Sequence, residues 1–335
     1  MNTKINPKAT WLLVCGMMLG AQALLAQTIT TGAGDGSATL GTSGTGATNS
    51  IAVDANGNKY VATGALNVIR KITPANAVTT FAGTGAKGFS GDNGAASAAT
   101  FNNIQDLFIT NGNLYVADAG NRRIRKIDLT TNTITTVAGN GTSLVTGGGI
   151  GAATGVAVDM FGNVYVAGGG RNVVVKVTPA NVSSIFAGTG AAGFSGDNAA
   201  ATAATLNLPT DLYIAAGRLY IADTRNRRIR MVNLTTNVIT TVAGDGTTNI
   251  TGNGIGAAVG VIADGTGSIY VATGNAGNAV RKISGTTYTT IAGGNATGAY
   301  AGDNGSGTGS SLNLPVDLAM YGTNLLIADE KNRRV

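Results

Sequence analysis

The sequence predicts an all-β fold: a six-bladed β-propeller built of four-stranded antiparallel blades. Two observations lead to this prediction. A unit of about 50 residues recurs six times, and each unit contains several short β-like segments separated by turn residues. Units of this length with four strands each are typical of propeller blades. The 3.6-residue apolar period that a helical solenoid needs is absent.

The repeat is marked by an aromatic or aliphatic residue followed by Val or Ile and then Ala. This motif begins at Tyr60, Tyr115, Tyr165, Tyr220, Tyr270 and Leu326, at steps of 55, 50, 55, 50 and 56 residues. The alternating steps define two repeat types. We call them A units (Tyr60, Tyr165, Tyr270) and B units (Tyr115, Tyr220, Leu326), so the chain contains three A–B pairs.

The second unit shows the four expected strands of a blade. Its β-like segments are "DLFIT" (106–110), "NLYVAD" (113–118), "IRKID" (124–128) and "TITTVAG" (133–139). They are rich in Val, Ile, Thr and Tyr, which favour strands. The first two are joined through Asn111-Gly112, a dipeptide that suits a tight hairpin because both residues tolerate positive φ.

The N-terminus has the features of an export signal. Lys4 and Lys8 precede an apolar stretch that ends in small residues, which is typical of a secretory signal peptide. We therefore divide the chain into a signal peptide, 1–26, and a propeller domain, 27–335. The alternatives are cleavage after Ala23, a retained N-terminal anchor, or a lipoprotein; Val14 before Cys15 disfavours the last.

The composition excludes several kinds of chemistry. The 335 residues include no histidine, and the one cysteine, Cys15, lies within the predicted signal. A mature chain without Cys or His has no disulfide, no thiolate zinc site and no Ser-His-Asp arrangement. The net charge of +6 includes Lys4 and Lys8, so the mature chain carries 20 basic and 16 acidic residues, or +4. This modest excess does not require a nucleic-acid partner.

The repeats resemble the NHL-repeat family of bacterial and teneurin-type propellers. The segment "NLPTDLYIAAGRLYIADTRNRRIRMV" (207–232) is similar to the family pattern of Asn-x-Pro, a strand, "LYIAD" and Asn-x-Arg-Ile. The loops "GFSGDNGAASAATFNN" and "GFSGDNAAATAATLNLP" are similar to its inter-blade loops. The resemblance covers residues 28–335 and implies a six-bladed propeller. The A units depart from it, because "NVIRK" (67–71) and "RNVVVK" (171–176) lack the Asn-x-Arg signature.

The two ends of the chain carry complementary parts of one unit. The segment "TITTGAGDG" (28–36) matches fourth-strand segments at 133–141, whereas the last unit stops within its third strand at Val335. We expect residues 28–34 to form the outermost strand of the last, incomplete blade and so to close the ring, which leaves no open edge. We also expect the natural protein to continue past Val335; an early stop is the alternative.

Three aspartates occupy equivalent positions in the B units. Asp106, Asp211 and Asp317 begin the innermost strands, so their carboxyl groups should lie on one face around the central channel. The A units have Ser50, Gly155 and Gly260 there. One interpretation is a site for a hard cation such as Ca²⁺. The favoured one is that each Asp pairs with an Arg, because buried charges need partners and the same B units carry "NRR" segments.

The same face should carry the turns between the second and third strands. We expect a structural turn motif in which Asp and Asn bond the backbone and Arg bridges to carboxylates. Its members are Asp118, Asn121, Arg123, Asp223, Asn226, Arg228, Asp329, Asn332 and Arg334. The recurring "SGDN" and "AGDN" segments are expected to form turns rather than Ca²⁺ loops. Further arginines are ligand-face candidates that would attract acidic polymers, or else solvated turn positions: Arg122, Arg125, Arg225, Arg227, Arg230 and Arg333.

These features favour an exported, non-catalytic binding or scaffold domain of a larger secreted, cell-surface or periplasmic protein. A near-symmetric surface suits a protein or polysaccharide ligand; no cofactor is expected, and nucleic acid is not an expected partner. The alternative is a propeller lyase or lactonase-like enzyme that uses the three aspartates and a divalent metal at the channel mouth. The one glutamate, Glu330, lies in the incomplete last unit.

Overall fold

The computed structural model describes residues 28–36, 45–143, 148–294 and 300–335. The predicted signal peptide lies outside the described residues. Within these ranges the chain forms β-strands and short 3₁₀ turns, and no helix is long and apolar enough to span a membrane. The prediction of an all-β fold is confirmed.

Among the described residues, four sheets have four antiparallel strands that follow one another in chain order, a fifth has four such strands and one short additional strand, and a sixth has two strands. The first pair of sheets comprises β1 (Ser50–Val53), β2 (Lys59–Thr63), β3 (Val68–Ile72), β4 (Val78–Ala82), then β5 (Ile104–Thr110), β6 (Asn113–Asp118), β7 (Arg123–Asp128) and β8 (Ile134–Ala138). The second comprises β9 (Gly155–Val158), β10 (Val164–Gly168), β11 (Val173–Val177), β12 (Ser183–Ala187), then β14 (Pro209–Ala215), β15 (Arg218–Asp223), β16 (Arg228–Asn233) and β17 (Val238–Ala243), with the short β13 (Ala199–Ala200) beside β17. The third comprises β18 (Gly260–Ala263), β19 (Ile269–Ala272), β20 (Ala279–Ser284), β21 (Thr287–Gly293), then β22 (Pro315–Tyr321) and β23 (Asn324–Asp329).

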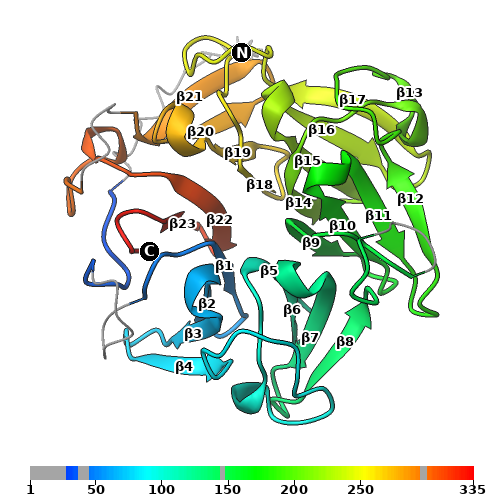
Figure 1. The fold of residues 1–335 in the computed structure, drawn as a ribbon. Helices are drawn as coiled ribbons and strands as arrows, with labels where there is room; N and C mark the ends of the chain where they lie inside the picture. The colour runs from blue at the N-terminus through cyan, green and yellow to red at the C-terminus, as the bar shows by residue number, and fades with distance from the viewer. Residues whose placement is uncertain (1–27, 37–44, 144–147, 295–299) are drawn as a thin grey trace, which may run out of the picture.

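The sheets stand around a common axis as the blades of a propeller (Figure 1). The innermost strands contact one another in the cyclic order β1, β5, β9, β14, β18, β22 and back to β1. The predicted propeller arrangement of four-stranded antiparallel blades is therefore present. The described strands form five such blades, because the sheet of β22 and β23 has two strands.

The core lies between the blades and explains the repeat motif. The Ala of each motif is completely buried: Ala62, Ala117, Ala167, Ala222, Ala272 and Ala328. A small side chain at this position lets adjacent blades approach closely. The motif tyrosines of two A units pack edge to face on phenylalanines of their own outer strands, with ring centroids 4.9 Å apart in Tyr60–Phe81 and in Tyr165–Phe186.

The N-terminal segment lies against the last part of the chain, as predicted. The Val335 carbonyl accepts hydrogen bonds from the amides of Gly32 and Ala33, at 2.6 and 3.1 Å, and the Val335 amide donates to the Ala33 carbonyl at 3.0 Å. The Ile29 carbonyl accepts a hydrogen bond from the Asn304 amide at 2.8 Å. In the complete blade of β5–β8, the Ile134 carbonyl of the outer strand β8 accepts the equivalent bond from the Asn93 amide at 2.7 Å. Residues 28–33 thus occupy the outer-strand position beside the last sheet, although only Thr28 forms a β-bridge there.

Glycines with positive φ end the outer strands. Gly139, directly after β8, has φ +85°, and a Cβ there would lie 2.3 Å from the Arg122 carbonyl oxygen. Gly244, after β17, has φ +87° and the same close approach to Arg227. The hairpin glycine Gly112 also has positive φ, +69°, but a Cβ there meets nothing within 4 Å.

The environments of Gly139 and Gly112 predict different losses in the free energy of unfolding when each glycine is replaced by alanine. Gly139→Ala should lower the free energy of unfolding by about 3 kcal/mol, since it combines left-handed backbone strain with a steric clash. The control Gly112→Ala carries the strain alone and should cost about 1 kcal/mol. Urea unfolding of both variants measures the difference; equal losses would contradict the packing described here.

Candidate functional site

The B-unit turns between the second and third strands are organised by the predicted Asp–Asn pair. In the first copy, Asp118 accepts hydrogen bonds from the Asn102 amide at 2.8 Å and from Asn121 Nδ2 at 2.7 Å. Asn121 also donates to the Gly88 carbonyl at 2.7 Å. The pairs Asp223–Asn226 and Asp329–Asn332 repeat this geometry at 2.8 and 2.7 Å. The motif therefore ties each turn to the segment that precedes the blade.

The third member of the motif, Arg123, forms no ion pair with a carboxylate among the residues that the structure describes. Its guanidinium donates to the Asn121 carbonyl at 2.9 Å and stacks 3.9 Å from the centre of the Phe89 ring. Arg228 Cζ lies 3.8 Å from the centre of the Phe194 ring, and Arg334 Cζ lies 3.9 Å from the centre of the Tyr300 ring. Each arginine therefore fixes one aromatic ring of the inter-blade loop through a cation–π contact.

The three rings form a repeated exposed feature, which we call the aromatic trio: Phe89, Phe194 and Tyr300. Their exposed fractions are nearly equal, at 43, 43 and 44%. None of the three rings was among the site residues predicted from the sequence. A signal was present, because each ring stands directly before the "SGDN" or "AGDN" segment of its loop.

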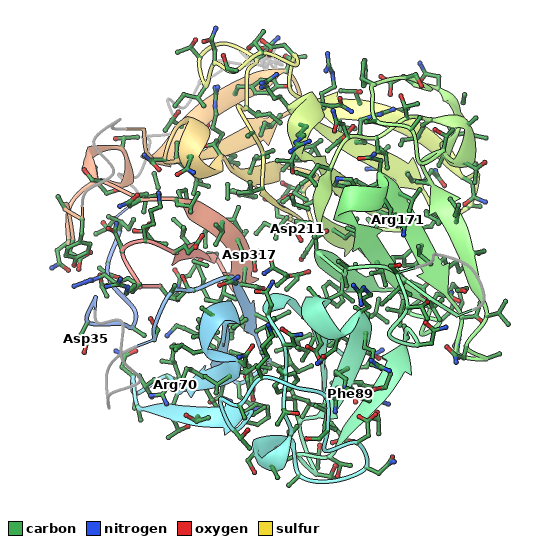
Figure 2. The ribbon with its side chains drawn as sticks, viewed as in Figure 1. Asp35, Arg70, Phe89, Arg171, Asp211 and Asp317 are labelled. Atoms are coloured by element: carbon green, nitrogen blue, oxygen red, sulfur yellow. The ribbon has the colours of Figure 1, made fainter. Side chains whose placement is uncertain are left out.

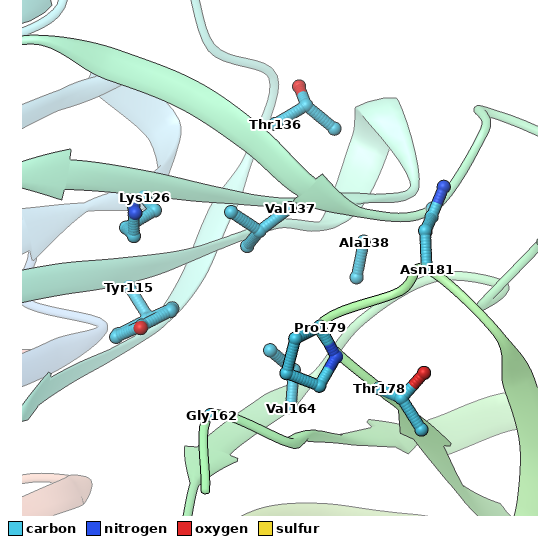
Figure 3. Close-up of a pocket in the computed structure, with 11 residues that line it drawn as sticks. Tyr115, Lys126, Thr136, Val137, Ala138, Gly162, Val164, Thr178, Pro179 and Asn181 are labelled. Carbon is cyan, nitrogen blue, oxygen red and sulfur yellow. The ribbon is translucent and has the colours of Figure 1, made fainter.

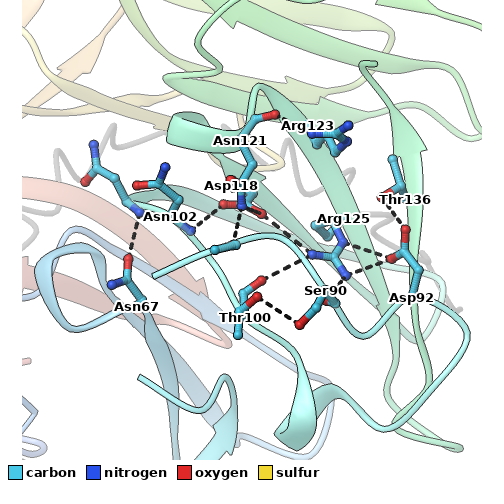
Figure 4. Close-up of polar contacts among 12 residues, drawn as sticks. Asn67, Ser90, Asp92, Thr100, Asn102, Asp118, Asn121, Arg123, Arg125 and Thr136 are labelled. Carbon is cyan, nitrogen blue, oxygen red and sulfur yellow. Dashed lines mark hydrogen bonds and ion pairs between the residues drawn. The ribbon is translucent and has the colours of Figure 1, made fainter. Parts of the chain in front are cut away.

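Arg125 and Arg230 do not belong to a surface rim. Both side chains are completely buried, whereas the sequence analysis named them as ligand-face candidates. Arg125 donates to Asp92 at 2.7 and 3.0 Å and to the Ser90 carbonyl at 3.0 Å (Figure 4). Arg230 pairs with Asp197 at 2.8 Å and donates to the Ser195 carbonyl at 2.9 Å. These arginines clamp the "SGDN" segments onto the third strands β7 and β16.

The remaining candidate arginines lie nearer to solvent. Arg225 and Arg122 are exposed, and Arg227 is half-buried. The guanidinium groups of Arg122 and Arg227 reach the Gly141 and Gly246 carbonyls at 3.4 Å. Arg333 donates to Gly36 of the N-terminal segment at 3.0 Å. Positive charge on this face therefore comes mainly from residues of the turns.

We predict that removing Asp92, the acidic partner of the buried Arg125, lowers the stability of the fold. Asp92→Ala leaves Arg125 buried with only the more distant Asp118, at 3.7 Å, as an acidic neighbour. The free energy of unfolding should fall by about 3 kcal/mol, as for other broken buried pairs. Lys87→Ala, an exposed change in the same loop, should alter it by less than about 0.5 kcal/mol. Chemical denaturation measures both; a small loss in Asp92→Ala would show that the clamp is not structural.

Asp106, Asp211 and Asp317 converge at the axis, as predicted. One carboxylate oxygen from each lies within 4.8 Å of the others, and all three side chains are buried. Figure 2 shows Asp211 and Asp317 near the centre of the ring, with Phe89 farther out at the sheet of β5–β8. We call these three residues the Asp triplet.

The prediction that each aspartate of the Asp triplet pairs with an arginine is wrong. Within the described ranges, the ion pairs of the B-unit arginines are with Asp92, Asp118, Asp197 and Asp223. The triplet instead accepts backbone hydrogen bonds. Asp106 receives the Val156 amide at 2.7 Å, Asp211 receives Val261 at 2.7 Å, and Asp317 receives Ile51 at 2.8 Å. Each also accepts the amide of the leucine that follows it in the chain.

The A units have Gly155, Gly260 and Ser50 at the positions equivalent to the triplet, and these residues lie close to the neighbouring inner strands. A Cβ at Gly155 would lie 2.8 Å from the Thr210 carbonyl oxygen, and a Cβ at Gly260 would lie 2.6 Å from that of Val316. Glycine therefore permits the close approach of the inner strands. Ser50 replaces glycine in the first A unit, and its hydroxyl lies 2.6 Å from Asp317 and 3.0 Å from Asp106.

Burial and mutual repulsion raise the pKa of the triplet carboxyl groups. Burial is the main cause at Asp106, and the charge of Asp317 adds to it. The pKa of Asp211 rises through burial and through Asp106 and Asp317. Burial raises the pKa of Asp317 to about 6, against opposing hydrogen bonds from Ser50 and Ile51. The three carboxyls therefore hold protons more tightly than exposed aspartates do.

A cavity of about 200 Å³ opens beside the triplet at the channel mouth. Asn49, Gln105, Thr154 and Thr210 line it with polar groups, and Glu330 adds a fourth carboxyl. Burial raises the pKa of Glu330 as well. The arrangement offers oxygen ligands that suit a hard cation, and it also suits protons shared among carboxyl groups.

The raised pKa values predict how stability depends on pH. A group whose pKa is higher in the folded state stabilises the fold below its unfolded value, and this contribution is lost as pH rises through the folded value. The wild type should therefore lose unfolding free energy relative to Asp211→Asn between about pH 4 and pH 7.5. Denaturation in EDTA at several pH values measures this; a difference that grows with pH would mean that the ionised triplet is the stable form.

The fold and the site together define the chain as a β-propeller with a polar axial cavity and a loop face that repeats in its B units. No family model matches the chain, and no curated protein matches its sequence. Membership of the NHL-repeat family therefore stays a prediction.

Solved structures match the fold at low sequence identity. A protein of unknown function from Bacteroides thetaiotaomicron has a TM-score of 0.66 at 17% identity, over 92% of this chain and 74% of that chain. An auxiliary nutrient binding protein from the same organism gives 0.61 at 14%, over 87% and 68%. Virginiamycin B lyase from Staphylococcus aureus gives 0.52 at 13%, over 84% and 78%. At these identities the likeness shows the propeller fold alone.

Proposed function

We propose that this chain is an exported, non-catalytic binding propeller of the NHL type, whose loop face binds a polysaccharide. In this proposal its six sheets form a six-bladed ring, and residues 28–33 close the last blade. The observation that carries the binding function is the aromatic trio. Three equivalent rings, each fixed by an arginine on one side, are exposed on one repeated face.

Rigid aromatic rings suit binding because they present a large contact area at a low cost in conformational entropy. The apolar C–H face of a sugar ring packs on such a surface. A polymer that repeats its own units meets the three equivalent rings at once, so that weak single contacts gain from multivalency. The turn arginines Arg122 and Arg225 add positive charge, which favours an acidic polysaccharide.

Two further observations support a binding role. One structural neighbour is an auxiliary nutrient binding protein, a protein named for binding rather than for catalysis. Another is a catalytically inactive variant of virginiamycin B lyase in which a histidine was replaced. The present chain has no histidine, so it lacks the residue that was replaced in that neighbour. The predicted signal peptide favours a secreted, cell-surface or periplasmic location.

The proposal predicts that the trio controls polysaccharide affinity. In affinity electrophoresis through gels that contain alginate, pectin or amylopectin, the wild type should be retarded by at least one polymer. Removing all three rings (Phe89→Ala, Phe194→Ala and Tyr300→Ala) should abolish retardation, and Phe194→Ala alone should weaken it about tenfold or more.

Phe161→Ala, an exposed aromatic change outside the loops of the trio, is the matched control. It should leave retardation unchanged. Equal retardation of the wild type and the triple variant would overturn the proposed face. Failure of every polymer, together with capture of a protein by the wild type, would replace the polysaccharide with a protein ligand.

A second candidate function is supported by the Asp triplet. Three converging carboxyl groups beside a polar cavity offer ligands for a divalent metal, as a propeller lyase or lactonase-like enzyme would need. The test is the melting temperature in CaCl₂ and in EDTA, because a ligand of the folded state raises it. Identical values would exclude Ca²⁺ binding at the triplet.

A further inference from the structure

A second cavity lies between two blades, apart from the channel mouth. It has a volume of about 430 Å³, within the range of small-molecule sites. One wall comes from β6, β7 and β8, and the other from β10 and the turns at Gly162 and Thr178–Asn181. In Figure 3, Tyr115 and Lys126 lie side by side at one end of the cavity, and Asn181 and Thr178 lie at the other.

The internal repeat provides a matched interface for comparison. The sheets of β14–β17 and β18–β21 meet as those of β5–β8 and β9–β12 do, one A–B pair later in the chain. There, Tyr288 of β21 packs, together with Met231 and Val242, against the cluster of buried residues between the two blades. Its hydroxyl accepts a hydrogen bond from the Gly244 amide at 3.3 Å. Val242 and Gly244 correspond to Val137 and Gly139, which line the cavity, so Tyr288 occupies the equivalent space.

Two differences between the repeats distinguish the two interfaces. Tyr288 pairs with Ile283, and the corresponding pair in the earlier A unit is Ser183 with Val177. A serine therefore stands where the other interface has a large ring. On the facing blade, Lys126 stands where the other interface has Met231, since each pairs with its motif tyrosine, Tyr115 or Tyr220. The interface that contains Tyr288 and Met231 is filled and apolar, whereas the interface that contains Ser183 and Lys126 is open and carries a cation.

The polar groups at the Tyr115 end have unused hydrogen-bonding capacity. Within the described part of the chain, neither the Tyr115 hydroxyl nor the Lys126 ammonium forms a hydrogen bond or an ion pair. Lys126 is near enough to help lower the pKa of Asp128, but that carboxylate is bonded first by the amides of Thr131 and Thr130. By contrast, the A-unit lysine Lys176 lies over the Tyr165 ring at 5.7 Å.

The turns beside the cavity carry exposed apolar residues that the other A units lack. Met160 and Phe161 are 83 and 75% exposed in the turn that contains Gly162, and Val182 is 61% exposed next to Asn181. The equivalent turns carry Ala55-Asn56 and Gly265-Thr266. Within the cavity, the Lys126 cation at one end and the apolar groups of Val137, Val164 and Pro179 along the walls match an anion with an apolar body.

We propose that this inter-blade cavity binds an amphiphilic carboxylate, with the carboxylate at Lys126 and Tyr115 and the apolar body along Val137, Val164 and Pro179. The site is separate from the aromatic trio and from the Asp triplet. It belongs to one interface of the ring, so it has a stoichiometry of one ligand per chain.

Isothermal titration calorimetry with decanoate, and with decanol as the uncharged probe, tests the proposal. The wild type should bind one decanoate. Ser183→Tyr, which copies the filled interface, should weaken decanoate binding at least about tenfold. Lys126→Met, which copies Met231, should weaken decanoate about tenfold and leave decanol unchanged, as expected for the loss of a charge-assisted hydrogen bond. Lys176→Met removes a charge outside the cavity and should change neither affinity by more than about twofold.

Several results would overturn the proposal. They are no decanoate binding by the wild type, equal binding by Ser183→Tyr, or equal losses in Lys126→Met and Lys176→Met. Circular dichroism and the melting temperature show whether Ser183→Tyr is folded. If it is not, the comparison of the two lysine variants still decides. Polysaccharide retardation is measured in parallel; because the two sites are separate, its loss would bear on the loop face alone.

Discussion

The inner strands are joined around the axis by one repeated interaction, the hydrogen bond from an A-unit backbone amide to a B-unit aspartate. Asp106, Asp211 and Asp317 each accept the amide of the following A-unit strand, at 2.7 to 2.8 Å. These bonds act beside the apolar packing between blades and beside other inter-blade hydrogen bonds, such as that from Thr210 Oγ1 to the Val259 carbonyl at 3.0 Å. At the alternate contacts, from an A-unit inner strand to the next B-unit inner strand, Gly155 and Gly260 permit close approach to the Thr210 and Val316 carbonyls. Three negative groups are thereby brought together in a buried place, and their raised pKa values are the electrostatic consequence.

The outer parts of the blades are held by different means. Buried arginines at equivalent third-strand positions, Arg125 and Arg230, fasten the loops that carry the exposed rings. The stacked arginines Arg123 and Arg228 then orient those rings. Stability at the axis and the proposed binding at the loop face therefore rest on separate residues.

The sequence predicted the blades well because blade structure is local and periodic. The motif tyrosines, the Asn111-Gly112 hairpin and the Asp118–Asn121 turn all follow from short-range preferences. The convergence of the Asp triplet followed from the register of the repeat. The hydrogen-bond partners of the triplet could not be predicted from the register. Each aspartate bonds a backbone amide of another blade, and no residue pattern within its own unit indicates such a bond. Arg125 was expected on the surface because "NRRIR" is strongly charged, yet strand pairing turns its side chain inward to Asp92. The cavity lined by Tyr115 and Lys126 is recognised only when two interfaces are compared in three dimensions.

The central claim is that the Asp triplet joins consecutive blades through backbone amides. Hydrogen exchange of Asp211→Ala tests it most directly, because the variant removes the acceptor of the Val261 amide and leaves those of Val156 and Ile51 in place. The account predicts that exchange accelerates in β18, around Val261, by at least about tenfold, with a much smaller change at Val156 in β9. Uniform acceleration across β1, β9 and β18, or no change at Val261, would contradict it.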